Sequence, residues 1–466
     1  MIIDGSHLEC FKAYDVRGRV PDQLDADLAE LIGRAYAQLV RPRRVAVGHD
    51  VRLTSPTLTE ALCRGLTRSG VDVVDIGLVG TEEVYFATFA LELDGGVMVT
   101  ASHNPRDYNG MKFTREQARP ISSDTGLLDM EAAVVAALSA AEEGSVPRGT
   151  GGNGPRGRIS QVDTRPRYVE HLLSYVDVKN LKPLKVVVNA GNGGAGPVID
   201  RLERILPFEF IKINHNPDGS FPEGVPNPLL TENRAVTAQA VVAEGAHLGI
   251  AWDGDFDRCF FFDERGVFVE GYYMVGLLAQ RALKRHPGAP IIHDPRLVWN
   301  TEEIVRQAGG NPVACKSGHA FIKEKMRAVD AAYGGEMSAH HYFREFSYCD
   351  SGMIPWLQVT EVISESGRPL SEMVEERIAR YPISGEINLT LTDPSRALAA
   401  VRNRYASQAL RVDETDGLSI DYPSWRFNVR MSNTEPVVRV NVETRGNKDL
   451  LHAKTQEVLD TLERAK

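Results

Sequence analysis

Apolar positions in the first part of the chain alternate between the spacing of an α-helix and short unbroken runs. Helical spacing covers residues 24–39 and 55–66, and Ser55-Pro56 supplies a cap and a first-turn proline for the second helix. Short apolar runs rich in β-branched residues predict buried strands at Val45 to Val47, Val71 to Ile76 and Val97 to Val99. This alternation predicts an α/β fold with short loops and a mostly parallel sheet.

The same alternation recurs in two further blocks and then changes its order. Helical patterns cover 168–175, 272–285 and 301–308, another helix begins at His319, and strands are predicted at 185–189, 247–252, 259–262 and 291–293. From about Tyr381 the order becomes strand, helix, two strands and helix, at 387–391, 396–406, 426–430, 437–443 and 448–464. That order predicts a small and partly antiparallel α+β domain.

The composition is that of an ordinary globular protein. Of 466 residues 42% are hydrophobic and 25% charged, and this length predicts two to four domains. The formal net charge of −10 disfavours nucleic acid or an anionic membrane as partner. Five scattered cysteines form no Cys-x-x-Cys pair, and no signal-peptide pattern or membrane-length apolar stretch occurs, so we expect a cytoplasmic protein without disulfides or zinc. A stretch rich in Gly, Pro and Arg at 144–158 predicts a linker.

The segment Ser102-His-Asn-Pro105 follows the third predicted strand and cannot continue it. Proline lacks the donor for a sheet hydrogen bond and restrains the residue before it. We therefore expect Ser102 on a tight loop at the carboxyl end of a strand, where α/β sheets bind ligands. An ordinary turn serine is the alternative, and the absence of a Gly-x-Ser-x-Gly elbow disfavours a serine hydrolase.

A turn with three carboxylates lies between the predicted strands 247–252 and 259–262. Asp253, Asp255 and Asp257 alternate in sequence, and hard oxygen ligands of this kind suit Mg²⁺ or Ca²⁺. An EF-hand is excluded because Arg258 occupies the position that needs glycine and the flanks are strands. Arg258 beside three acids suggests that a substrate phosphate comes close, and a structural ion pair is the alternative.

Further loops carry groups suited to anions or sugars. Two of these loops are basic: one contains Tyr14 and Arg17, and the other contains Lys112. For each loop, solvated surface charge is the alternative to anion binding. The glycine-rich turn at 191–196 lacks a Walker lysine, which favours close packing over nucleotide binding. Carboxylate, hydroxyl and imidazole groups at 336–341 suit sugar hydroxyls better than zinc. The loop from Arg430 to Thr434 is a candidate phosphate clamp.

The serine loop, the three-aspartate loop and the loops at 336–340 and 430–434 follow one another in an order that resembles the α-D-phosphohexomutases. Within that family the chain is most similar to bacterial phosphomannomutases, over essentially its whole length. The resemblance implies three related α/β domains with mixed sheets and a smaller C-terminal α+β domain around a central active-site cleft. It implies domains at 1–152, 153–257, 258–378 and 379–466, each giving one loop to the site.

The resemblance also implies a role for each matching residue. Ser102 corresponds to the phosphoserine that carries the transferable group, and an oxygen of its phosphate completes an Mg²⁺ site formed by Asp253, Asp255 and Asp257. The catalytic centre corresponds to Tyr14, Arg17, His103, Lys112, Arg258 and His319. Sugar contacts correspond to Glu336, Ser338 and His340, and the distal phosphate clamp to Arg430, Ser432, Asn433 and Thr434. Two positions depart from many relatives: Ala339 replaces glycine and Arg296 replaces lysine.

The activity implied by the resemblance is reversible conversion of mannose 1-phosphate to mannose 6-phosphate through a hexose 1,6-bisphosphate, which serves GDP-mannose synthesis. Phosphoglucomutase or dual-specificity activity is the alternative within the family, and a non-catalytic sugar-phosphate-binding protein is the alternative from another class. We expect small sugar phosphates as partners and neither nucleic acid nor membrane. The general base is left open between Lys112, His319 and an arginine, and the oligomeric state between monomer and dimer.

Overall fold

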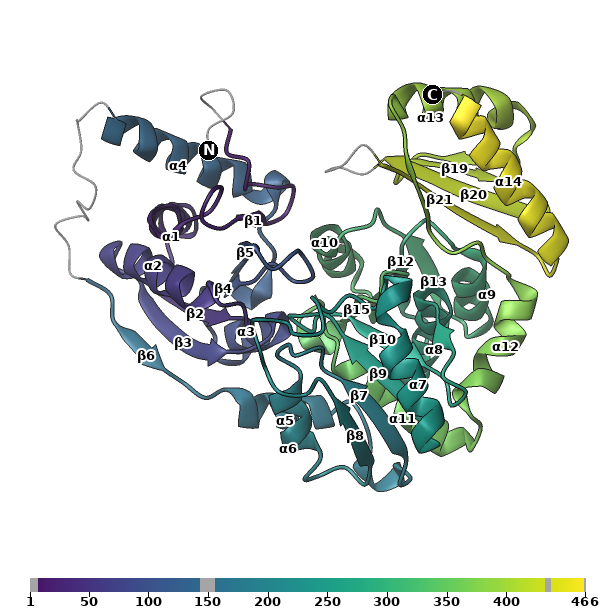
Figure 1. Cartoon of the computed structure of the whole chain (residues 1–466), viewed down its shortest axis with the longest axis horizontal. Helices are drawn as coiled ribbons and strands as arrows, with labels where there is room; N and C mark the ends of the chain where they lie inside the picture. The colour runs from purple at the N-terminus through teal and green to yellow at the C-terminus, as the bar shows by residue number, and fades with distance from the viewer. Residues whose placement is uncertain (1–6, 143–155, 432–436, 465–466) are drawn as a thin grey trace. The chain divides into compact units, whose positions relative to one another are not determined.

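The computed structural model describes residues 7–142, 156–431 and 437–464. Figure 1 shows the whole chain, coloured by residue number. The chain divides into two compact units. The first unit comprises Met1–Phe262 with Glu345–Glu365, and the second comprises Asp263–Arg344 with Ser366–Lys466.

The first unit contains a mixed β-sheet. Its strands, in spatial order, are β1 (Val16–Arg19), β5 (Tyr108–Arg115), β4 (Gly95–Val99), β2 (Arg44–His49), β3 (Asp72–Leu78) and β6 (Ile159–Gln161). Strands β4, β2, β3 and β6 are parallel, whereas β5 runs antiparallel to β1 and β4. The accompanying helices are α1 (Ala26–Val40), α2 (Ser55–Arg68), α3 (Thr81–Ala90) and α4 (Leu127–Glu142). Strand β6 joins this sheet although it follows the boundary expected at residue 152.

Alternate side chains of the buried strands face different helices. Val97 and Val99 of β4 pack in one core with α1, α2 and α4, whereas Met98 packs in another core with α3. Because both faces of β4 are apolar and covered, the strand is buried along its whole length. The point at which the following loop leaves the sheet is thereby fixed.

The second sheet, also in the first unit, repeats part of this arrangement. Its strands in that unit are β10 (Cys259–Phe262), β9 (Leu248–Trp252), β7 (Lys185–Asn189) and β8 (Glu209–Ile213), in spatial order. Strands β9, β7 and β8 are parallel, and β10 is antiparallel to β9. The remaining elements that belong largely to this unit are α5 (Arg165–Leu173), α6 (Gly196–Leu202), α7 (Ala235–Glu244), β16 (Cys349–Asp350) and α11 (Ile354–Ser366).

The second unit contains the third sheet, with the same order again. Its strands in that unit are β15 (His341–Phe343), β14 (Tyr333–Gly335), β12 (Pro290–His293) and β13 (Asn311–Ala314). Strands β14, β12 and β13 are parallel, and β15 is antiparallel to β14. The other helices and strands of this unit that precede the fourth sheet are β11 (Phe268–Val269), α8 (Gly271–Arg285), α9 (Trp299–Gln307), α10 (His319–Val329) and α12 (Leu370–Arg380). The pairing order β5-β4-β2-β3 thus occurs three times in the chain.

The fourth sheet is antiparallel and belongs to the second unit. Its spatial order is β17 (Ile387–Thr390), β21 (Val437–Thr444), β20 (Trp425–Met431), β19 (Leu418–Asp421) and β18 (Arg411–Asp413). Helices α13 (Pro394–Tyr405) and α14 (Lys448–Arg464) share its apolar core (Figure 1).

The expected fold class is confirmed: three α/β domains with mixed sheets precede a smaller C-terminal α+β domain. The expected domain boundaries stay predictions. The stretch predicted as a linker lies largely outside the described residues. Within the described residues, no helix combines the length and apolar character needed to span a membrane.

Candidate functional site

Ser102 lies in the loop that follows β4, at the carboxyl edge of the first sheet. Its backbone φ is +49°, in the left-handed region that favours glycine. The Ser102 N–H donates to Thr100 Oγ1 at 2.8 Å, and the Asn104 N–H donates to the Ala101 carbonyl at 2.9 Å, which closes a tight turn. Ser102 is 3% exposed, so this turn holds its hydroxyl in a nearly buried position.

The three-aspartate loop connects the antiparallel strands β9 and β10 in the same unit. Asp253, Asp255 and Asp257 are buried, and one oxygen of each carboxylate lies within 4.8 Å of the others. The Ser102 hydroxyl donates to Asp253 Oδ2 at 2.8 Å. The two loops, about 150 residues apart in sequence, therefore meet at one place.

Lys112 lies on β5 and binds two of these carboxylates. Its Nζ lies 2.8 Å from Asp255 Oδ2 and 2.5 Å from Asp257 Oδ2. Burial would lower the pKa of Lys112, but the two carboxylates outweigh burial and hold that pKa above its usual value. Conversely, burial would raise the pKa of Asp255, and Lys112 holds it well below its usual value. Lys112 and Asp255 are therefore charged together.

Arg258 links the two loops through its guanidinium group. It donates to Asp253 Oδ2 at 2.6 Å, to Ser102 Oγ at 3.2 Å and to His103 Nδ1. Burial would lower the pKa of Arg258, but Asp253 and Asp257 raise it above the usual value. A permanent cation is thus fixed beside the serine oxygen.

Arg17 reaches the serine loop from β1. Its Nε pairs with Asp15 Oδ2 at 2.7 Å, and its Nη1 donates to the Asn104 side chain at 2.5 Å and to the Ala101 carbonyl at 3.1 Å. Burial would lower the pKa of Arg17, but Asp15 outweighs it and the pKa is raised. Tyr14 is half-buried in the loop that precedes β1.

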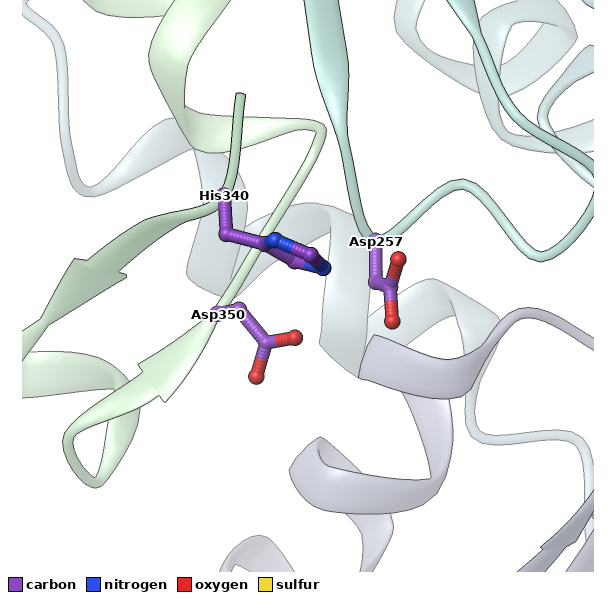
Figure 2. Close-up of side chains that lie close together, drawn as sticks. All are labelled: Asp257, His340 and Asp350. Atoms are coloured by element: carbon purple, nitrogen blue, oxygen red, sulfur yellow. The ribbon is translucent and has the colours of Figure 1, made fainter. Parts of the chain in front are cut away.

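Asp350, on β16, is a further buried carboxylate of the first unit. Figure 2 draws it with Asp257, and one oxygen of each lies within 4.8 Å of the other. Its charge adds to those of Asp255 and Asp257 in raising the pKa of Lys112 against burial. His340, drawn in the same figure, belongs to the second unit.

The three aspartates fit a divalent cation. Their carboxylates are hard oxygen ligands, gathered within ligand distance and withdrawn from water. Oδ1 of Asp255 is buried and accepts no hydrogen bond from the described residues. A buried carboxylate oxygen without a donor is costly unless a cation binds it. The donor set therefore suits Mg²⁺ at this place.

In the second unit, Glu336 begins the loop between β14 and β15. Its Oε1 accepts from the Gly318 N–H at 3.0 Å, at the start of α10, and its Oε2 accepts from the Tyr342 hydroxyl at 2.6 Å. His340 Nδ1 lies 3.3 Å from both the Glu336 carboxylate and the Ser338 hydroxyl. Burial would raise the pKa of Glu336, but His340 and Arg296 lower it to about 2. The carboxylate is therefore ionised at neutral pH.

Arg430 lies near the end of β20 in the fourth sheet. Its Nη1 lies 3.5 Å from Asp416 Oδ2, and its Nε has no hydrogen-bond partner among the described residues. Burial and the neighbouring Arg296 lower the pKa of Arg430. Unused guanidinium donors beside other cations suit a phosphate. Ser432, Asn433 and Thr434 lie outside the described residues.

Comparison with known proteins gives matches along almost the whole chain. Four family models of phosphoglucomutase/phosphomannomutase domains match this chain. The model of α/β/α domain I matches residues 8–135, that of domain II 166–266, that of domain III 270–381 and that of the C-terminal domain 386–461. The chain belongs to the phosphoglucomutase/phosphomannomutase family.

Two curated relatives and one solved structure illustrate the family likeness. A protein of Xanthomonas campestris named "Phosphohexose mutases" is 60% identical over 455 residues, with 98% of this chain and 99% of the relative covered. A phosphomannomutase of Salmonella montevideo is 58% identical over 462 residues, with the same coverage. The crystal structure of a phosphoglucomutase/phosphomannomutase family protein from Burkholderia thailandensis has a TM-score of 0.85 and 32% identity, and covers 100% of this chain and 98% of that one.

In this family member the structure brings seven of the expected residues of the first unit into one cluster with Ser102. They are Arg17, His103, Lys112, Asp253, Asp255, Asp257 and Arg258. In the second unit it brings together Glu336, Ser338 and His340, and His319 is the first residue of α10. Ala339, which stands where many relatives have glycine, has a strained backbone: its φ is +70°, a conformation that glycine adopts without strain.

Two residues of the serine-loop environment were missed by sequence reasoning. Arg52 is 1% exposed, and its guanidinium donates to backbone carbonyls of the serine loop. Thr81 donates through Oγ1 to Asp255 Oδ2 at 2.5 Å. Arg52 follows β2, whose carboxyl end lies at the same sheet edge as that of β4. That shared edge is the signal that could have identified it.

Proposed function

We propose that this chain is a phosphomannomutase, an isomerase that interconverts mannose 1-phosphate and mannose 6-phosphate. The observation that carries the proposal is the place of Ser102, whose hydroxyl lies 2.8 Å from Asp253 Oδ2 and 3.2 Å from the Arg258 guanidinium. A nucleophilic oxygen set between acidic metal ligands and a fixed cation suits phosphoryl transfer. The name of the Salmonella relative, at 58% identity over nearly the whole chain, supports the substrate.

In the proposed reaction Ser102 begins as phosphoserine. A hydroxyl oxygen of the sugar monophosphate attacks the phosphorus, so that a sugar O–P bond forms while the serine O–P bond breaks. The proton leaves the sugar hydroxyl and ends on the serine oxygen, carried by a base that stays open between Lys112, His319 and an arginine. Of these, Lys112 is held protonated by Asp255 and Asp257 and would have to give up its own proton first. The hexose 1,6-bisphosphate then reorients and returns its other phosphoryl group to Ser102, which regenerates the phosphoserine.

Charge neutralisation dominates such a transfer. Arg258 and Lys112 place two cations beside the serine oxygen and the aspartates. Asp253, Asp255 and Asp257, with an oxygen of the serine phosphate, would hold Mg²⁺, which neutralises charge on the transferred group when bound. Arg17 fixes the turn that carries Ser102 through the Asn104 side chain and the Ala101 carbonyl.

The second unit supplies recognition in this proposal. Glu336 Oε1 accepts one hydrogen bond, from the Gly318 N–H, and keeps a second lone pair for a sugar hydroxyl, whereas Oε2 is held by Tyr342 and His340. Ser338 and His340 stand beside it. Arg430, with Ser432, Asn433 and Thr434 assigned by the family resemblance, would hold the phosphate that is not reacting.

The ratio of kcat/KM for mannose 1-phosphate to that for glucose 1-phosphate tests the proposal. Both are measured with Mg²⁺ and a trace of hexose 1,6-bisphosphate to phosphorylate the serine. A strong preference for mannose supports a phosphomannomutase. Inactivity on both sugars would contradict the proposal and favour a non-catalytic binding protein.

A dual-specificity phosphohexomutase is the second candidate. The broader name of the Xanthomonas relative, at 60% identity, favours it. Comparable kcat/KM values for the two sugars would support this candidate. For either activity we propose a cytoplasmic enzyme, and the mannose reaction would supply mannose 1-phosphate for GDP-mannose synthesis.

A further inference from the structure

A four-residue motif occurs twice in the chain at corresponding places. His49-Asp-Val-Arg52 stands at the end of β2, and His293-Asp-Pro-Arg296 stands at the end of β12. Each of these strands pairs in parallel with two neighbours, β3 and β4 for β2, and β13 and β14 for β12. The serine loop follows β4, and the Glu336 loop follows β14. Each motif therefore lies beside the loop of its own sheet that carries a proposed function.

The two motifs fold alike. Asp50 Oδ1 accepts from the Arg52 N–H at 3.0 Å, and Asp294 Oδ1 accepts from the Arg296 N–H at 3.0 Å. The histidine Nδ1 of each motif donates to the carbonyl of the following aspartate, at 2.8 Å in the first motif and 3.0 Å in the second. Both aspartates and both arginines are buried. Two copies of one sequence pattern thus form the same hydrogen-bonded turn.

In the first motif the arginine holds the serine loop. Its Nη2 donates to the carbonyls of Ser102 at 2.9 Å and Asn104 at 2.6 Å. Its Nη1 donates to the carbonyls of Pro105 at 2.7 Å and Tyr108 at 2.8 Å. One planar cation therefore fixes four carbonyls of the loop whose serine has a left-handed backbone.

In the second motif the aspartate holds the Glu336 loop. Oδ2 of Asp294 accepts from the Met337 N–H at 2.8 Å and from the Arg296 guanidinium at 2.9 Å. Arg296 in turn lies 3.9 Å from Glu336 Oε1 and donates to Glu386 at 3.2 Å. The backbone and the carboxylate of the loop are both oriented by this motif.

The second sheet has a similar turn after β7, but without the charged aspartate and arginine. Asn189, at the end of β7, accepts from the Gly191 N–H at 3.0 Å through Oδ1. Here the three-aspartate loop is contacted by backbone atoms instead of charged side chains. The Gly194 N–H donates to the Gly254 carbonyl at 3.3 Å, and a Cβ on Gly193 would lie 2.7 Å from that carbonyl oxygen. The glycine-rich turn therefore packs against the metal loop.

We infer that the Asp-x-Arg turns are a repeated positioning device, in which Arg52 sets the phosphoserine loop and Asp294 with Arg296 sets the sugar-recognition loop. The inference rests on the proposed function and deepens it. Because each turn acts on one loop, loss of the Arg52 contacts lowers phosphoryl transfer, whereas loss of the Asp294 contacts weakens sugar recognition.

Amide hydrogen exchange of the full-length protein tests the positioning without reference to activity. The variants are Arg52→Lys, Arg52→Met and Asp294→Asn, with Arg64→Met, at a partly exposed arginine of α2, as the matched control. We expect both Arg52 variants to speed exchange in 101–108 by about tenfold or more and to leave 334–341 unchanged. Asp294→Asn should speed exchange at Met337 and leave 101–108 unchanged. Equal exchange in all variants, or an increase spread over the whole protein, overturns the inference.

Steady-state kinetics with mannose 1-phosphate gives the second readout. Arg52→Lys should lower kcat by roughly 10²-fold with KM within about twofold, because a displaced nucleophile slows the chemical step. Asp294→Asn should raise KM by about tenfold with a smaller change in kcat. The same kcat and KM pattern in both variants overturns the inference. If the wild type is inactive on hexose phosphates but the exchange responses are as expected, the proposed function fails and the positioning inference is supported.

Discussion

Ser102 combines a left-handed backbone, near-complete burial and hydrogen bonds to two charged partners. Replacement by alanine keeps the turn and removes only the oxygen. We expect Ser102→Ala to lower mutase turnover by several orders of magnitude, because the nucleophile is lost. Initial rates with mannose 1-phosphate measure this, with Ser69→Ala as the control. Turnover near that of the wild type would remove Ser102 from the mechanism.

The stability of the protein should depend on pH through the single residue Glu336. Its pKa of about 2 lies below the ordinary 4.5, so its contribution to stability is present above pH 4.5 and is lost as pH falls through 2. Glu336→Gln should lower the free energy of unfolding by up to about 3 kcal/mol at neutral pH, and the difference should shrink below about pH 4.5. Thermal unfolding between about pH 3 and 7 checks this. Glu372→Gln, at an exposed position, is the control, and a difference that grows on acidification would contradict the assignment.

At the scale of elements, α1 and α2 cross where Gly65 has no side chain. A Cβ there would lie 2.1 Å from the Glu30 carbonyl oxygen of α1. Gly65→Ala should therefore separate the helices and cost about 2 kcal/mol or more of stability. Gly245→Ala is the comparison, since φ is +58° there but nothing lies within 4 Å. Urea unfolding measures both variants, and an equal or smaller cost for Gly65→Ala would show that the helices adjust freely.

The strand β20 ends near Arg430, whose guanidinium is proposed to bind the distal phosphate. Arg430→Ala should raise KM for mannose 1-phosphate by about tenfold or more, because a charge-assisted contact is lost, while the far-UV circular dichroism stays unchanged. Arg411→Ala, on the exposed strand β18, is the matched control. Unchanged binding of both mannose monophosphates would make the clamp assignment wrong.

Much of the element order could be predicted from the sequence, and the reason is local. Each correctly predicted element has a single pattern of apolar positions, either strand-like or helical, and is bounded by polar or turn residues. Examples are the strands around Val97 and at 259–262, and the helix 448–464. The strands β18 and β19 were missed, because they are only three and four residues long and the apolar side chains at the start of the hairpin, Leu410 and Val412, are exposed. The loops with Ser102 and the three aspartates could be placed because each follows a buried strand. Arg52 could not, because its role depends on carbonyls about 50 residues away.

At the scale of the whole molecule, one strand order occurs three times, and in each copy the loop after the corresponding strand carries proposed functional residues. These strands are β4, β9 and β14, followed by Ser102, Asp253 and Glu336. The sequence shows this repetition only weakly, because no residue type is common to all three loops and the His-Asp-x-Arg motif occurs in only two of the three copies. The repetition becomes visible in the order in which the strands pair, and that order depends on which apolar segments are buried together in the folded chain.

The phosphoryl group itself can be followed on the protein and on the sugar. The protein is incubated with Mg²⁺ and hexose 1,6-bisphosphate, the modified residue is located by mass spectrometry, and mannose 1-phosphate is then added in a single turnover. We predict that the phosphoryl group is on Ser102 and leaves it for the sugar at least as fast as steady-state turnover. A phosphoryl group on another residue, or a phosphoserine that persists while the sugar is converted, would contradict the proposed role of Ser102.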